Sequence, residues 1–275
     1  MSKAYNSFYN FAVSIVSGIA GFKSEMKAYY LSEHAYKHTV YPEMIKELHN
    51  IHSESRCFII GNGPSLTVND LNKLDGEITF AANTIFNIFD DTDWRPTYYA
   101  SQDDKLIPVI IERSLKIESK GFFFPYNLYD VKIPNRNNIY RYFVDKTDMY
   151  PELPHFSDDI SSKIYECYTI SYTMIQLAIY MGFKEIYLLG MDHSFAVEVK
   201  ADGTIVHNNV KNHFGNSEEI IENQYLPSTD KSTNAFIAAK KYADAHGIKI
   251  YNATRGGKLE VFERVNLDDI VKEKI

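Results

Sequence analysis

Short runs of consecutive apolar residues alternate with longer segments of helical spacing from residue 56 onward. Such runs, when they end in glycine or a polar residue, are typical of strands that are buried on both faces of a sheet. They predict strands at residues 57–60, 78–82, 97–101, 121–124, 139–143, 185–190 and 248–251.

The segments between these runs predict helices at residues 84–91, 105–116, 170–182 and 231–246. Strands that alternate with helices favour a parallel sheet with helices on both faces. We therefore expect an α/β fold with a doubly wound, mostly parallel, Rossmann-like sheet. In such folds ligands bind beyond the carboxyl ends of the strands, so the residues directly after each strand are the first candidates for a site.

The amino-terminal fifth of the chain has a different pattern. Residues 8–22 are the most apolar stretch, but about 15 residues are fewer than the roughly 20 that a membrane-spanning helix needs. We expect an amphipathic helix there that packs on the main domain, on a second copy of the chain or on a membrane surface. The following residues have helical composition with a break at Pro42. We predict a helical appendage over residues 1–54 and one α/β domain over residues 55–275.

Composition and charge narrow the function classes. The 275 residues carry a net charge of −7, which argues against a nucleic-acid-binding surface because such surfaces are basic. The two cysteines, Cys57 and Cys167, are too few for a disulfide framework or a four-cysteine zinc site and suit a reducing compartment. We expect a cytoplasmic protein, either free or peripheral to the inner face of the membrane.

A glycine-rich loop follows the first predicted strand directly. Its glycines let the backbone turn tightly and approach a ligand, and successive backbone N–H groups in such a turn hold anions such as phosphate. No Gly-Lys-Ser/Thr follows, so this is not a Walker A loop. The pattern also fits a tight turn without a ligand, but its place after a buried strand favours binding. The loop residues are Gly61, Asn62, Gly63, Pro64 and Ser65.

Polar side chains also follow the second and third predicted strands. Asn83 comes after the second strand and suits a nucleobase, a ribose or a sugar. Gln102, Asp103 and Asp104 come after the third strand. The two aspartates either bind a divalent cation or provide the N-cap of the helix that begins near residue 105.

Residues 191–229 form an unusually long connection before the last predicted helix, which is typical of a lid or a binding segment. It holds His193, His207 and His213, with Tyr225 near its end. A histidine titrates near neutral pH and suits proton transfer from a hydroxyl group, and His213 is our first candidate for a general base. The spacing of the histidines matches no zinc motif, so we predict no metal site.

Asp230 competes with His213 for the role of base. It stands directly before a helical segment, where an aspartate also serves as an N-cap. Near the end of the chain Arg255 and Lys258 flank a Gly-Gly pair, which forms either a second anion contact or an ordinary turn.

Three segments of the chain resemble a known group of proteins. They are residues 59–66 (IIGNGPSL), the pair Ala82-Asn83, and residues 174–192 (MIQLAIYMGFKEIYLLGMD). The chain resembles bacterial sialyltransferases that build capsule and lipooligosaccharide ends from CMP-sialic acid. It is also similar to a related uncharacterised family of capsule-locus proteins. Motility-associated flagellin glycosyltransferases and hydroxymethylpterin pyrophosphokinases share this core.

The resemblance implies roles for several of these residues. The glycine-rich loop and Asn83 would hold the CMP part of the donor, with Gln102 and Asp103 as further ligand contacts. Asp192 and His193 would lie beside the cytidine or ribose. The donor sugar or phosphate would face Thr169, Ile170 and Ser171.

The sequence departs from the family pattern at three places. The Ser-Gly pair that the family has before the helix is Ile170-Ser171 here. The family's general base is a histidine, and its position counted back from the last strand is occupied here by Asp230. An arginine of the family is replaced by Cys167 or Tyr168.

The implied activity is a metal-independent, inverting glycosyltransferase of surface-polysaccharide assembly that needs no cofactor. Its partners would be a CMP-activated acidic sugar and a glycan acceptor, and the amino-terminal helices would contact a membrane or a second copy. Hydroxyl groups such as those of Tyr225 and Ser171 would stabilise the leaving phosphate.

Two alternatives stay open. One is an ATP- and Mg²⁺-dependent pyrophosphokinase with Asp103 and Asp104 as metal ligands. The other is a catalytically inactive scaffold that binds a nucleotide.

Overall fold

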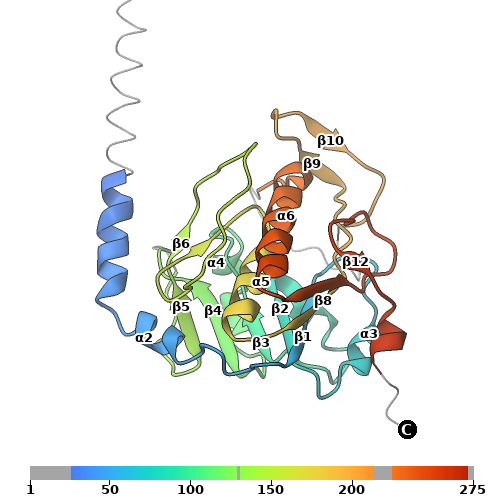
Figure 1. Cartoon of the computed structure of the whole chain (residues 1–275), viewed down its shortest axis with the longest axis horizontal. Coiled ribbons are helices and arrows are strands. Elements are labelled where there is room, and N and C mark those ends of the chain that lie inside the picture. The colour runs from blue at the N-terminus through green and yellow to red at the C-terminus, as the bar shows by residue number, and fades with distance from the viewer. Residues whose placement is uncertain (1–25, 129–130, 213–224, 272–275) are drawn as a thin grey trace, which may run out of the picture.

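The computed structural model describes residues 26–128, 131–212 and 225–271. Within these ranges the core is an eight-stranded sheet of order β12-β11-β8-β1-β2-β3-β4-β5, and all neighbouring strands are parallel (Figure 1). The predicted doubly wound, parallel α/β sheet is therefore confirmed. Its strands are β1 (Arg56–Ile60), β2 (Thr79–Ala82), β3 (Tyr98–Ala100), β4 (Gly121–Pro125), β5 (Ile139–Tyr142), β8 (Glu185–Leu189), β11 (Lys249–Asn252) and β12 (Glu263–Arg264).

The direction of winding reverses beside β1. The chain runs outward from β1 through β2, β3 and β4 to β5, and then returns to the other side of β1 as β8. Ile60 at the end of β1 is in register with Leu189 at the end of β8. The loops that leave these two strands therefore begin side by side. This is the topological switch point, where doubly wound sheets bind their ligands.

Helices cover both faces of the sheet. Along β1, Cys57 and Ile59 belong to one buried cluster and Phe58 and Ile60 to the other, because alternate side chains of a strand point to opposite faces. Helices α2, α5 and α6 contribute to the first cluster, and α3, η1, α4 and α7 to the second. Their bounds are α2 (Tyr41–Lys46), α3 (Val68–Lys73), η1 (Asn83–Ile88), α4 (Ile107–Ser114), α5 (Ile170–Tyr180), α6 (Thr229–Ala245) and α7 (Leu267–Ile270).

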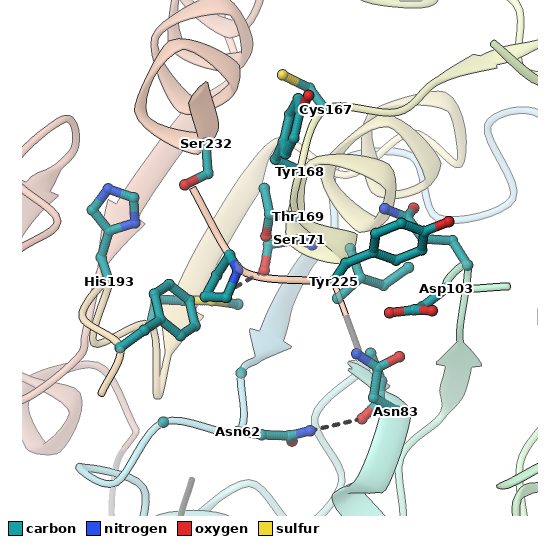
Figure 2. Close-up of a pocket in the computed structure, with 18 of the residues that line it drawn as sticks. Asn62, Asn83, Asp103, Cys167, Tyr168, Thr169, Ser171, His193, Tyr225 and Ser232 are labelled. Carbon is teal, nitrogen blue, oxygen red and sulfur yellow. Dashed lines mark hydrogen bonds between the residues drawn. The ribbon is translucent and has the colours of Figure 1, made fainter. Parts of the chain in front are cut away.

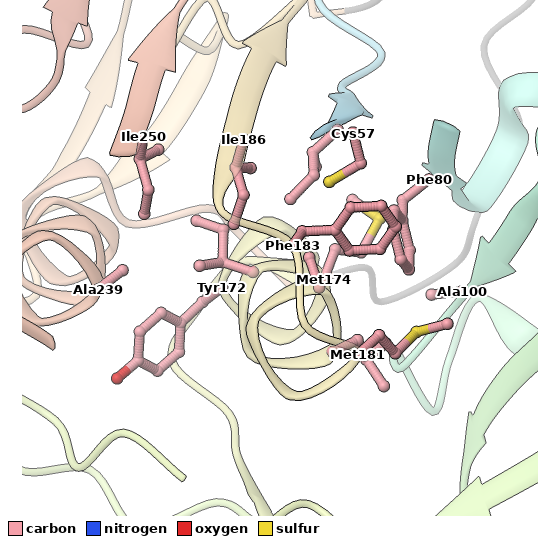
Figure 3. Packing of buried hydrophobic residues seen from close by; sticks show 14 of the residues in the cluster. Cys57, Phe80, Ala100, Tyr172, Met174, Met181, Phe183, Ile186, Ala239 and Ile250 are labelled. Carbon is pink, nitrogen blue, oxygen red and sulfur yellow. The ribbon is translucent and has the colours of Figure 1, made fainter. Parts of the chain in front are cut away.

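Helix α5 is the centre of the first cluster. All its residues from 171 to 178 are buried, as expected for a helix that is apolar around most of its circumference. Figure 3 shows Met174 and Met181 packed beside Phe80 and Phe183. This packing fixes the axis of α5 against the sheet, and with it the position of the amino-terminal turn.

Two pairs of short strands flank the core. Strands β6 (Val144–Asp145) and β7 (Ile164–Tyr165) form a parallel pair, and Asp145 is in register with Tyr165. Strands β9 (Val197–Val199) and β10 (Ile205–His207) form an antiparallel hairpin inside the predicted lid segment. In the part of the chain that the structure describes, no helix combines the length and the apolar character that a membrane crossing requires.

Two predicted elements need correction. The segment predicted as a helix at 84–91 is the 3₁₀ helix η1, and Thr84 lies outside helical geometry. The segment that we assigned to an appendage also contributes to the domain core. Ile45 of α2 is fully buried in the first cluster together with Leu48, and the buried Tyr36 donates a hydrogen bond to the carbonyl of Ser161 over 3.0 Å. The apolar helix predicted at 8–22 lies outside the described residues.

Candidate functional site

A cavity of about 720 Å³ opens at the carboxyl ends of β1, β2, β3 and β8. Figure 2 shows Asn62 and Asn83 toward one end of it and Tyr168 toward the other, with Thr169 and Ser171 between them. The loops after these strands, the start of α5 and the segment before α6 form the described lining. The predicted site residues that line it are Gly61, Asn62, Gly63, Asn83, Gln102, Asp103, Thr169, Ile170, Ser171, Asp192, His193 and Tyr225.

The glycines of the loop after β1 allow two backbones to approach closely. The N–H of Gly61 donates to the carbonyl of Leu189 over 2.7 Å, and the N–H of Gly63 donates to that of Gly190 over 3.0 Å. A Cβ on Gly61 would lie 2.4 Å from the Gly190 oxygen, and one on Gly63 would lie 1.9 Å from Oδ2 of Asp192. The acceptor of Gly61 is the last residue of β8, and that of Gly63 directly follows β8. These two N–H groups therefore already have backbone partners, and the prediction that the loop holds a phosphate stays a prediction.

Ser65 orients Asp192 and does not line the cavity with it. The Oγ–H of Ser65 donates to Oδ2 of Asp192 over 2.7 Å, and the Ser65 N–H donates to the same oxygen over 3.3 Å. Pro64 likewise lies outside the described lining. Asp192 thus lines the cavity with one carboxylate oxygen fixed by the loop after β1.

Asn62 and Asn83 meet at the ends of β1 and β2. The Nδ2 group of Asn62 donates to the Ala82 carbonyl over 3.1 Å, while the buried Oδ1 atom has no hydrogen-bond partner among the described residues. Asn83 has a left-handed backbone, and its Oδ1 accepts from the Ser101 hydroxyl over 2.9 Å. A buried acceptor without a donor costs about 1–3 kcal/mol, so Asn62 Oδ1 is placed to accept an N–H or O–H group of a ligand.

The amino-terminal turn of α5 faces the cavity. Thr169 is its N-cap, and the Thr169 hydroxyl accepts from the N–H of Ser171 over 3.3 Å. The Ser171 hydroxyl lies 3.2 Å from the sulfur of Met191. The first turn of a helix carries N–H groups without intrahelical partners and the positive end of the helix dipole. The start of α5 is therefore a further candidate anion site beside the glycine loop.

The polar residues after β3 are already engaged in internal contacts. The Gln102 Oε1 atom accepts from the buried hydroxyl of Thr173 over 2.5 Å. Oδ1 of Asp103 accepts from the N–H groups of Lys105 and Leu106, over 2.8 and 3.0 Å, as a cap of the turn that leads into α4. The capping interpretation of Asp103 is therefore confirmed.

Asp104 and Asp103 each have one carboxylate oxygen engaged within the protein. Asp104 pairs with Lys146 over 3.1 Å, and Asp103 is occupied by the backbone cap. Across the described residues no three histidine, cysteine, aspartate or glutamate side chains gather closely enough to hold a metal ion.

Glu166 and Lys146 are site residues that the sequence did not reveal. They directly follow the paired strands β7 and β6, which brings the Lys146 ammonium to 3.9 Å from Oε2 of Glu166. That oxygen is buried, and no hydrogen-bond partner for it exists in the described parts of the chain. Burial raises the pKa of Glu166 to about 7, with Asp104 and Asp103 adding to the rise and Lys146 opposing it. Neither residue belongs to a sequence motif that could have marked it.

The far end of the cavity carries a second ionic cluster. The Tyr168 hydroxyl donates to Asp148 over 2.9 Å, and the Lys231 ammonium donates to the same carboxylate and to the Tyr168 oxygen over 2.8 Å. Cys167 or Tyr168 stands where the sialyltransferases that the sequence resembles have an arginine. Lys231 supplies a positive charge beside Tyr168. Burial raises the pKa of the neighbouring Cys167 to about 12, so its thiol stays protonated.

The structure separates the candidate bases. Asp230 lies outside the described lining of the cavity. Its carboxylate lies 3.6 Å from the Lys200 ammonium and accepts a hydrogen bond from the N–H of Ala201. The assignment of Asp230 as base therefore has no support in the geometry. His213 lies outside the described residues.

His193 and Tyr225 do line the cavity. His193 has a left-handed backbone, and its Nε2 lies 2.8 Å from the Thr233 hydroxyl. Burial lowers the pKa of His193. The ring of Tyr225 lies under the ammonium of Lys105, 3.8 Å from the ring centroid. Their proposed roles stay predictions.

Arg255 belongs to a structural ion pair. Its guanidinium donates to both oxygens of the buried Asp70, over 2.6 Å at Oδ1, and to the hydroxyl of Thr67, the N-cap of α3. Arg255 thus already has an ionic partner, and the Gly-Gly segment beside it packs against the backbone of Asp192, whose carbonyl accepts from the N–H of Lys258 over 2.8 Å. The suggested second anion contact stays a prediction. The ion pair of Arg255 and Asp70 fixes the start of α3 to the loop after β11.

The chain is similar to a known protein family and to a solved structure. A family model described as "6-hydroxymethylpterin diphosphokinase MptE-like" matches residues 32–198. A solved structure of a MAF glycosyltransferase from Magnetospirillum magneticum AMB-1 is similar, with 12% sequence identity and a TM-score of 0.44. The similarity covers 83% of this chain and 38% of that chain, so this chain spans well under half of its length. No curated protein matches the chain. Because the family model covers more than half of the residues, the chain belongs to the MptE-like family.

Proposed function

We propose that this protein is a transferase that binds a nucleotide-activated donor in the cavity and moves its activated group to an acceptor hydroxyl. One observation carries the proposal: the amino-terminal turn of α5 and Asn62, whose buried Oδ1 has no partner among the described residues, line the same cavity at the switch point of the sheet. A helix start binds phosphate, and a buried carbonyl acceptor suits the N–H or O–H groups of a nucleoside.

The first candidate is transfer of an acidic sugar from a CMP-activated donor. The leaving group would be the phosphate of CMP at the start of α5. The N–H groups of the first helical turn would stabilise the charge that develops there, with help from the Tyr225 hydroxyl. Asp103 and Asp104 are engaged in internal contacts, which favours a leaving group stabilised by protein groups. Attack by the acceptor from the opposite face inverts the anomeric centre. The acceptor class we infer is a surface glycan of a bacterium.

The second candidate is transfer of a diphosphoryl group from ATP to a hydroxymethyl group. The description of the family model favours it, because it names a 6-hydroxymethylpterin diphosphokinase. Such a reaction uses Mg²⁺, and one carboxylate oxygen of Asp103 and one of Asp104 are already engaged, by the backbone cap and by Lys146. This candidate therefore ranks second.

Thermal unfolding with a panel of nucleotides separates the candidates. CMP, CDP, UDP, GDP and ATP are each added with Mg²⁺ and with EDTA. A ligand at about 100 times its dissociation constant adds roughly 2.7 kcal/mol of stability. Stabilisation by CMP or CDP that persists in EDTA is the expected result. Stabilisation by ATP with Mg²⁺ alone would select the second candidate, and the absence of any shift would contradict nucleotide binding.

A further inference from the structure

Glu166 and Asp104 both line the cavity, and each carries one buried carboxylate oxygen without a hydrogen-bond partner among the described residues. Oε2 of Glu166 and Oδ1 of Asp104 are both shielded from solvent, and neither has a hydrogen-bond partner among residues 26–128, 131–212 and 225–271. Buried polar atoms in folded proteins are almost always satisfied, so such atoms in a binding cavity indicate a missing hydrogen-bond donor. A hydroxyl group is the simplest donor that an incoming acceptor can supply.

The position of Glu166 relates it to the donor site. Only residues 167 and 168 separate Glu166 from Thr169, the N-cap of α5. Because consecutive Cα atoms are about 3.8 Å apart, the Cα atoms of Glu166 and Thr169 lie within about 11 Å of each other. An acceptor that bonds to Glu166 is therefore beside a donor whose phosphate lies at the start of α5.

The groups around Glu166 bring its pKa close to neutral pH. Burial disfavours the charged form, and the Asp103 and Asp104 carboxylates add to this effect. The Lys146 ammonium, 3.9 Å away, favours the charged form. A carboxylate that titrates near neutral pH is a good general base, whereas an ordinary exposed carboxylate is too weak a base. The ionisable groups that face Glu166 are Asp103, Asp104, Tyr142, Lys146 and Cys167.

We propose that Glu166 is the general base that accepts the proton of the acceptor hydroxyl, an inference that rests on the transferase function proposed above. In the glycosyl transfer, a bond forms between the acceptor oxygen and the anomeric carbon. The bond between that carbon and the CMP phosphate oxygen breaks, and its electron pair leaves with CMP. The proton of the hydroxyl moves to the Glu166 carboxylate. In diphosphoryl transfer the hydroxyl oxygen bonds to the β-phosphorus of ATP. The bond from that phosphorus to the bridging oxygen of the α-phosphate breaks, AMP leaves with the electron pair, and Glu166 takes the hydroxyl proton.

The test uses the full chain and the variant Glu166→Gln. The probe is CMP-sialic acid, with water in place of the acceptor hydroxyl, and the readout is the rate of CMP release. A general base contributes about 10²–10⁴-fold, so Glu166→Gln should release CMP at least about 100 times more slowly. The thermal shift caused by CMP should be unchanged in this variant. Glu112→Gln, on the exposed surface of α4, is the matched control and should behave as wild type.

The pH profile provides a readout that a merely structural role would not move. In the wild type, kcat/KM should rise with pH to a plateau above about 7, and Glu166→Gln should lack this rise. Lys146→Met removes the favourable charge and should move the rise to higher pH. Asp104→Asn removes an unfavourable charge and should move it to lower pH.

The outcomes separate failure of the base from failure of the function. Wild-type release of CMP with an unaffected Glu166→Gln variant would overturn the role of Glu166 and leave the transferase proposal in place. If the rise of kcat/KM with pH is lost in His193→Asn and kept in Glu166→Gln, His193 is the base. If the wild type releases neither CMP from CMP-sialic acid nor AMP from ATP with Mg²⁺, both proposals are wrong.

Discussion

Gly61 and Gly63 have a task in the structure besides the one that their pattern suggests. A loop with two glycines after a buried strand predicts an anion site, and here the N–H groups of both glycines bond to the end of β8 and to the residue after it. The glycines are needed because the segment after β8 passes too close for a side chain. They let the two loops pack closely at the cavity wall.

A methyl group at residue 63 should therefore be costly. In Gly63→Ala the new Cβ would lie 1.9 Å from Oδ2 of Asp192 and 2.6 Å from the backbone oxygen of Gly190. Overpacking of this kind costs about 1–3 kcal/mol, which urea denaturation should show as a lower midpoint. The double variant with Asp192→Ala should recover only part of the loss, because the backbone contact remains. Unchanged stability of Gly63→Ala would contradict the described packing of the two loops.

The raised pKa of Glu166 predicts a pH dependence of stability. The folded state binds a proton up to about pH 7, whereas the unfolded chain releases it near the ordinary value of 4.5. Between these values the folded state holds more protons, so the free energy of unfolding falls as pH rises through this window. The loss is up to about 3 kcal/mol at 1.36 kcal/mol per pKa unit.

Chemical denaturation of wild type and Glu166→Gln between pH 5 and 8 checks this. The wild type should lose more stability than the variant as pH rises, and the two should approach each other at pH 5. Parallel curves for the two proteins would show that Glu166 titrates normally.

The sequence predicted some of the residues that line the site and missed others. Asn62 and Asn83 were predicted because the carboxyl ends of parallel strands meet at one edge, and Asp192 because of the family resemblance; the structure places all three on the cavity. Glu166 and Lys146 follow strands of two residues each, which are too short to produce a recognisable apolar run. Their pairing depends on long-range contacts that no local pattern encodes.

At the scale of elements, α5 connects the core to the site. Its central residues are buried between the sheet and α6, and its first turn opens into the cavity. The continuous apolar stretch made this helix predictable. The 3₁₀ helix η1 was harder to predict, because the left-handed residue Asn83 and the non-helical Thr84 break the regular helix at its start.

The N-cap of α5 provides a test at this scale. Thr169→Ala removes the side-chain acceptor for the Ser171 N–H and should lower stability by about 1 kcal/mol. It should also weaken CMP binding, because the first helical turn becomes less ordered. Thr169→Ser keeps the acceptor and should retain both properties. Equal CMP affinity in all three proteins, measured by calorimetry, would place the phosphate elsewhere.

At the scale of the whole molecule, the domain extends further toward the amino terminus than the sequence predicted. Helical composition and the break at Pro42 suggested an appendage, because a local pattern does not show what a helix packs against. In the structure Ile45 and Leu48 join the core cluster of α5. The family match, which begins at residue 32, agrees with this extent.

Paired substitutions test this extent of the domain. Ile45 is fully buried, whereas Ile51 has 47% of its surface exposed. Ile45→Ala should destabilise the whole domain by about 2–5 kcal/mol in one cooperative transition. Ile51→Ala should stay within about 0.5 kcal/mol of wild type. Similar unfolding midpoints for both variants would mean that residues 41–54 are not part of the cooperative core.

Binding of a nucleotide at Asn62 is the central claim, and calorimetric titration with CMP in EDTA tests it most directly. Wild type should bind CMP, and Asn62→Ala should bind it about tenfold or more weakly, because a hydrogen bond to a buried acceptor is lost. Asn137→Ala, at an exposed position away from the cavity, should bind as wild type does. No heat of binding in the wild type, or equal affinity in Asn62→Ala, would contradict the account.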